Sequence, residues 1–124
     1  MTMSDGLLCT AAILLVITAF AHSVLGERRL IGPVLARREG VLASDLARVV
    51  LRFAWHLTSV TWAILALILV QLARDPATAR FWAAVGTGVA FTGVGLFDAI
   101  ATRGRHVGWP LLAAIGIAAL LSLR

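Results

Sequence analysis

The feature that most constrains this chain is a series of four long apolar runs, which together take up most of its 124 residues. The runs cover about residues 7–26, 46–73, 80–102 and 107–123, and their central parts carry almost no formal charge. A helix needs roughly 17–25 mostly apolar residues to cross the hydrocarbon core of a bilayer. The pattern therefore predicts an all-α integral membrane bundle of four transmembrane helices, forming one domain over residues 1–124.

The connections between the runs are short, except for the first. Pro76 lies in the second connection and Gly104 in the third, and both residue types end helices. Short connections make consecutive helices antiparallel neighbours, which predicts an up-down topology. In the longer first connection, residues 33–38 are predicted to form a short helix at the membrane interface.

Composition excludes several classes of protein. The chain is 60% apolar and only 14% charged, unlike an ordinary soluble enzyme or a disordered chain. Its net charge of +5 comes from arginines that flank the apolar runs, so the expected partner is the lipid bilayer with its anionic headgroups and not a nucleic acid. Cys9 is the single cysteine, so the chain has no internal disulfide.

The distribution of arginine predicts the orientation. Six arginines lie in the first and third connections, against three on the other side, which makes those two connections cytoplasmic by the positive-inside rule. Both termini are then expected in the periplasm of a bacterial inner membrane. No basic residue precedes the first run, so we expect this run to be a retained helix and not a cleaved signal peptide. The six are Arg28, Arg29, Arg37, Arg38, Arg103 and Arg105; the three are Arg74, Arg80 and Arg124.

Ionisable residues gather at one predicted membrane face. His22 and Asp98 each lie about 6 Å inside the end of a run, by the helical rise, and His56 lies at about the same depth in the uncharged part of the second run, which begins at Phe53. His106 stands just before the fourth run, and Glu27 just after the first. If the helices alternate in direction, all five fall on the cytoplasmic side. Such residues are costly in a bilayer and mark a candidate functional centre.

Arg52 completes this predicted layer. It lies near the N-terminal end of its helix and Asp98 near the C-terminal end of another, so neither charge is favoured by its own helix dipole. We therefore predict an ion pair between Arg52 and Asp98, with Arg48 as the alternative partner of Asp98. In the third run, small residues recur every three or four positions, which predicts a helix that packs closely against the bundle or a second copy.

The layer suggests a metal or haem site. His22, His56, His106, Asp98 and Glu27 are suitable ligands for a transition metal ion, although no short metal-binding signature is present. Alternatively, His22 and His56 are candidates for the axial ligands of a b-type haem, with Arg52 beside a propionate.

Two other hypotheses compete with a metal or haem site. In the first, the layer is purely structural, in an accessory or scaffold subunit of a larger membrane complex. In the second, it is part of a proton or ion route in a homo-oligomer, because titratable residues in membranes often mark such routes. Nucleophilic catalysis has little sequence support, since Ser23 directly follows His22 and no group is placed to orient His56 beside Ser59.

Overall fold

The computed structural model describes residues 2–124, which are almost entirely helical and contain no β-strand. The all-helical prediction is confirmed. Three long apolar helices and a shorter one make up the molecule, a composition compatible with a helical bundle. The long helices are α1 (Met3–Gly26), α3 (Asp45–Arg74) and α4 (Ala79–Thr102), and the shorter one is α5 (Trp109–Leu121).

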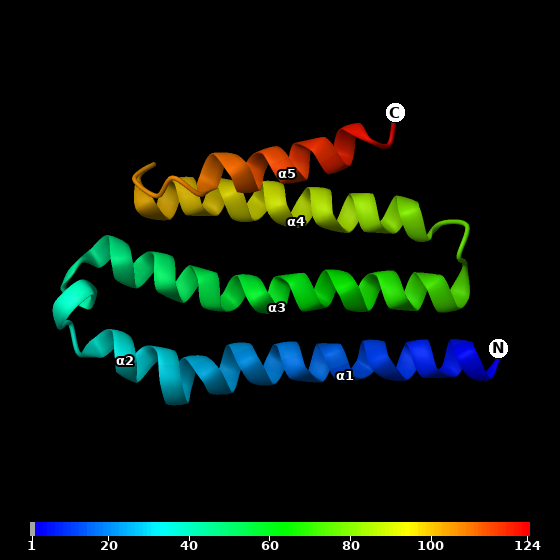
Figure 1. Ribbon diagram of the computed structural model, residues 1–124, viewed down its shortest axis with the longest axis horizontal. Coiled ribbons are helices and arrows are strands. Elements are labelled where there is room, and N and C mark those ends of the chain that lie inside the picture. The colour runs from blue at the N-terminus through cyan, green and yellow to red at the C-terminus, as the bar shows by residue number, and fades with distance from the viewer. Residues whose placement is uncertain (1) are drawn as a thin grey trace.

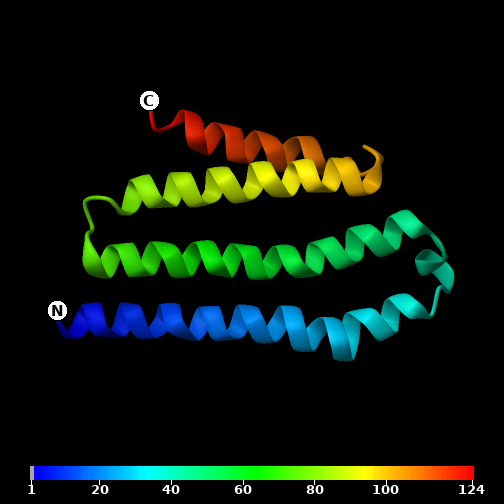
Figure 2. The same ribbon diagram turned by 180° about the vertical axis from the view of Figure 1, so that it is seen from behind.

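The helices lie side by side in the order α1, α3, α4, α5, so that each packs mainly against its neighbours in the chain (Figures 1 and 2). The α3–α4 pair is the least closely packed of the three. Consecutive helices run in opposite directions, as predicted. The N-terminus and the α3–α4 turn therefore lie at one end of the molecule, and the other two connections lie at the opposite end (Figure 1).

The first helix extends beyond both predicted ends. It begins at Met3, because the Thr2 hydroxyl accepts a hydrogen bond from the Asp5 N–H and the Asp5 carboxylate accepts one from the Thr2 N–H. It then continues through a π-helical turn (Glu27–Ile31) into α2 (Gly32–Ala36). The charges after Gly26 end the apolar run, but arginine and glutamate are good helix formers and do not end the helix.

The π-helical turn lies directly before Pro33. A proline inside a helix lacks an N–H donor, and its ring crowds the carbonyl four residues earlier. The wider turn directs the Gly32 N–H to the Glu27 carbonyl, so the chain passes the proline without leaving the helical path. A helical segment thus occupies 32–36, which overlaps the short helix predicted for 33–38 but begins one residue earlier and ends two residues earlier. A 3₁₀ turn, Gly40–Ala43, then leads to α3.

Three of the helical segments are long and apolar enough to cross a membrane: Met3–Ala36, Asp45–Arg74 and Ala79–Thr102. This finding suggests a membrane protein. The fourth helix, α5, has 13 residues, which corresponds to about 20 Å of helical rise. That is less than the roughly 30 Å of a bilayer core.

The burial pattern is the reverse of that in a water-soluble domain. Asp98 and Thr102 are each 1% exposed, whereas Phe20 is 70% and Ile100 77% exposed. A soluble monomer rarely leaves so much apolar surface in contact with water. The distribution is the one expected when hydrocarbon is the surrounding solvent.

Glycines in α4 and α5 let these two helices approach closely. A Cβ atom on Gly95 would lie 2.7 Å from the Ala113 nitrogen and 3.0 Å from the Trp109 carbonyl oxygen. On the facing helix, a Cβ on Gly116 would lie 2.7 Å from the Gly88 carbonyl oxygen. The small residues predicted to mediate close packing in the third run therefore serve the contact with α5.

Candidate functional site

The ionisable residues form two separate groups, because α1 packs against one side of α3 and α4 against another. The first group joins α1 to α3, and we call it the α1–α3 polar network. The second joins the end of α4 to the α4–α5 connection. The network consists of Ser23, Glu27, Arg52, His56 and Ser59.

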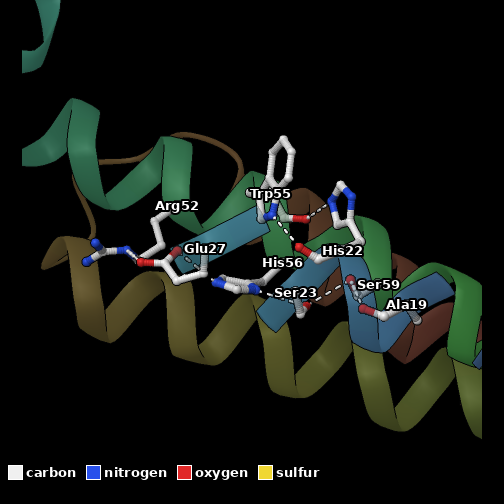
Figure 3. A network of polar contacts seen from close by, with 8 residues as sticks. All are labelled: Ala19, His22, Ser23, Glu27, Arg52, Trp55, His56 and Ser59. Atoms are coloured by element: carbon white, nitrogen blue, oxygen red, sulfur yellow. Dashed lines mark hydrogen bonds and ion pairs between the residues drawn. The ribbon is translucent and has the colours of Figure 1, made fainter. Parts of the chain in front are cut away.

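Glu27 is the central acceptor of the network. Its Oε1 atom lies 2.9 Å from Nε of Arg52, and its Oε2 atom lies 3.3 Å from Nε2 of His56 (Figure 3). The side chain of Glu27 is 29% exposed and that of His56 is 38% exposed. The carboxylate is thus half-buried between a guanidinium and an imidazole that both come from α3.

The other side of His56 faces two serines. Its Nδ1 atom lies 3.0 Å from the Ser23 hydroxyl, which donates to the Ser59 hydroxyl at 2.8 Å. Ser59 donates in turn to the Ala19 carbonyl oxygen at 3.0 Å (Figure 3). A continuous line of polar contacts therefore runs from Arg52 to the backbone of α1.

Counting protons along this line constrains His56. Each serine hydroxyl has one proton, and Ser59 uses its own on Ala19 while Ser23 uses its own on Ser59. In that arrangement Nδ1 of His56 must donate to Ser23. Nε2 of His56, on the other side of the ring, faces the Glu27 carboxylate. The two serine hydroxyls thus assign Nδ1 of His56 as the donor in its contact with Ser23.

His22 lies next to the network in an aromatic contact. Its ring stacks on the Trp55 indole with centroids 4.0 Å apart, and meets Trp62 edge-on at 5.0 Å. Its Nε2 atom lies 3.2 Å from the Trp55 carbonyl oxygen, and the indole N–H donates to the His22 carbonyl at 3.1 Å. The indole fits here because Gly26 has no side chain: a Cβ atom there would be 2.9 Å from Nε1.

The second group is built around Asp98. Its side chain is fully buried, and its Oδ2 atom lies 2.6 Å from Nδ1 of His106. Helix α4 is followed by Arg103 and Gly104, both with positive φ, and the Gly104 N–H donates back to the Ala99 carbonyl at 2.7 Å. This sharp end turns the connection back, so that His106 reaches the carboxylate.

The predicted pair of Arg52 with Asp98 is wrong. Arg52 pairs with Glu27 and Asp98 with His106. The alternative partner, Arg48, instead contacts the Asp45 carboxylate and donates to the carbonyls of the 3₁₀ turn that precedes α3. Arg52 and Asp98 do each have a partner, as their unfavourable positions in the helix dipoles predicted. The partner of Arg52 comes from the neighbouring helix α1, and that of Asp98 from the connection that follows α4.

The five predicted metal ligands are divided between these places. His56 and Glu27 lie in the network, His22 lies against Trp55, and His106 and Asp98 lie together near α5. Within residues 2–124, no three His, Cys, Asp or Glu side chains are grouped so as to hold a metal ion. Of the three residues predicted to hold haem, Arg52 and His56 both contact Glu27, whereas His22 contacts Trp55.

Sequence reasoning gave Ser23 and Ser59 little weight, yet they extend the network. The order of Glu27, His56 and Ser23 places a carboxylate, an imidazole and a hydroxyl in line, as in a nucleophilic triad. Ser23, however, lies within α1, where the backbone N–H groups are engaged in helical hydrogen bonds. They are not free to stabilise an oxyanion, so the arrangement favours cohesion between helices over acyl transfer.

A comparison of the chain with models of known protein families, with curated proteins and with solved structures finds no match.

Proposed function

We propose that this chain is a multi-pass membrane protein in which the α1–α3 polar network is a structural clamp, and that it serves as an accessory or scaffold subunit of a larger membrane assembly. The observation that carries the proposal is the pair of contacts made by the His56 ring. Both of its ring nitrogens already have partners within the chain, so the imidazole has no free lone pair aimed at an external ligand.

In a bilayer, a structural clamp would fix which helices pack together and in which register. Lipid tails are as apolar as leucine, so apolar faces alone give spanning helices little preference for one partner or register. A line of hydrogen bonds fixes both, because its members lose their partners if α1 slides or rotates against α3. Side-chain hydrogen bonds between membrane helices contribute roughly 0.6 kcal/mol each, on average, to the stability of the folded protein.

For the membrane arrangement, we propose four crossings of a bacterial cytoplasmic membrane with both termini in the periplasm. The arginine distribution supports this orientation. The apolar stretch 107–123 extends α5 at both ends and approaches the minimum length of a crossing. The exposed apolar side chains of all four helices support contact with lipid or with neighbouring membrane subunits.

The test compares the purified protein with its His56→Gln variant in a mild detergent. We expect no haem absorption and no stoichiometric metal in either protein, with a lower melting temperature for the variant. A Soret band, or one bound metal ion per chain that the variant loses, would overturn the structural interpretation in favour of a haem or metal site.

The accessory role needs a separate measurement. Cross-linking in native membranes, followed by native electrophoresis, should place the chain in a complex larger than the purified protein forms alone. Equal sizes before and after purification would contradict the accessory role and leave the clamp itself unaffected.

A further inference from the structure

A groove of about 730 Å³ lies between α3 and α4, the least closely packed pair of neighbouring helices. Its volume is in the range of ligand-binding pockets. Apolar side chains line most of its length, including Leu57 and Val60 of α3 and Val94 of α4. Arg48, Arg52 and His56 line one end of it. The groove is therefore apolar along most of its length and positively charged at one end.

A second, smaller cavity of about 210 Å³ continues from the polar end. The two cavities share Asp45, Val49 and Ala101 as lining residues, and the smaller one adds Arg103 and Arg105. Four arginines and one aspartate thus surround this end. Glu27 offsets the charge of Arg52, which still leaves an excess of positive charge at the mouth.

We propose that this groove binds one anionic phospholipid, with an acyl chain along the apolar part and the phosphate among the arginines at the mouth. The charge at the polar end supports this occupant, because guanidinium groups bind phosphate oxygens through paired, charge-assisted hydrogen bonds. The groove shares Arg52 and His56 with the α1–α3 polar network, but Arg103 and Arg105, on which the test below acts, lie outside that network.

The dimensions favour an acyl chain over a protein helix. From Val49 to Val60 the groove follows α3 over 12 residues, a helical rise of about 17 Å from the first to the last. Phe53 and Phe97 face each other from α3 and α4 with ring centroids 6.2 Å apart. The two rings are in contact, so no helix, which is about 10 Å across with its side chains, can enter between α3 and α4 at this level. The thinner acyl chain is proposed to lie over this pair of rings and not between them.

Gly93 allows the groove to be filled without disturbing the packing. It lines the groove, and a Cβ atom built on it meets no atom within 4 Å. A Gly93→Leu substitution should therefore occupy the space of the acyl chain. Gly6→Leu is the matched control, because Gly6 also lies in a helix with open space around it, far from the groove.

The experiment is native mass spectrometry of the full chain after incubation with equimolar phosphatidylglycerol and phosphatidylcholine. We expect the wild-type protein to retain one phosphatidylglycerol in preference to phosphatidylcholine. The Arg103→Gln/Arg105→Gln variant should weaken this preference about fivefold per arginine, the effect of one basic residue at an anionic membrane surface. The Arg74→Gln/Arg80→Gln control removes the same charge at the opposite end and should leave the preference unchanged.

The Gly93→Leu variant tests whether the acyl chain of the lipid occupies the apolar part of the groove. We expect it to lose both lipids from the tight site, whereas Gly6→Leu keeps them. Equal retention of the two lipids by the wild-type protein would overturn the proposal, as would full retention by Gly93→Leu. A change in oligomeric state of Gly93→Leu with unchanged lipid binding would assign the groove to a second protein copy and would also overturn it.

Discussion

His106 covers a carboxylate that is otherwise sealed inside the protein: its Nδ1 atom lies 2.6 Å from Oδ2 of Asp98, whose side chain is fully buried. Within residues 2–124 the other oxygen, Oδ1, has no hydrogen-bond partner. The charge of Asp98 thus depends on one neighbour. That neighbour comes from the connection that joins α4 to α5, so the pair links the end of one helix to the start of the next.

We expect His106→Ala to destabilise the protein by about 3 kcal/mol or more, because it leaves a buried charge without its partner. Adding Asp98→Asn should recover most of the loss, since a neutral amide costs less to bury than an unpaired carboxylate. Unfolding in mixed micelles measures both effects. If the double variant is no more stable than His106→Ala, the pair does not carry the stability assigned to it.

A second prediction concerns Ser23, which connects His56 to Ser59. Ser23→Ala should cost about 1–3 kcal/mol, because both neighbours lose a partner in a half-buried site. Ser122→Ala is the control: its exposed hydroxyl contacts only the Ala119 carbonyl of its own helix, and we expect a change within about 0.5 kcal/mol. Thermal unfolding in detergent compares the two. Equal effects would show that the network does not hold α1 to α3.

Gly26 tests the contact between α1 and Trp55. Gly26→Ala places a methyl group against the indole, 2.9 Å from Nε1, and overpacking of this kind costs about 1–3 kcal/mol. The emission of Trp55 should also shift as its ring leaves His22, provided that the other three tryptophans are replaced by phenylalanine. Gly93→Ala, in open space within α4, should instead be neutral or stabilising by up to about 1 kcal/mol. A stabilising effect of Gly26→Ala would contradict the packing described.

The proposed orientation is tested by cysteine labelling in a Cys9→Ala background. Val41 is 80% exposed and precedes α3, whereas Ala77 is exposed in the α3–α4 turn. In intact cells, a membrane-impermeant thiol reagent should label Ala77→Cys and not Val41→Cys, and both should react after permeabilisation. The opposite pattern would invert the orientation, and labelling of both in intact cells would contradict the crossing by α3.

The helices and their order along the chain could be predicted from the sequence. The length of the apolar runs and the turns near Pro76 and Gly104 are local properties of the chain. They were enough to predict the all-helical character and the alternating directions of the helices. The alternating directions in turn predicted the end of the molecule that holds the ionisable residues His22, His56, Asp98 and His106. The end of α1 did not follow, because a change from apolar to charged residues marks an interface and not the end of a helix.

Which charges form pairs depends on how the helices pack, and this could not be predicted from the sequence. Depth along a helix can be counted from the sequence, but the neighbour of each helix and its rotation about its own axis depend on packing. Because α1 contacts α3, and α5 contacts α4, Glu27 takes both Arg52 and His56, while Asp98 is left to His106. The sequence predicted one layer of ligands because these residues lie at similar depths, but the structure has two groups. Residues at the same height are close only when their helices are neighbours and the faces that carry these residues point toward each other.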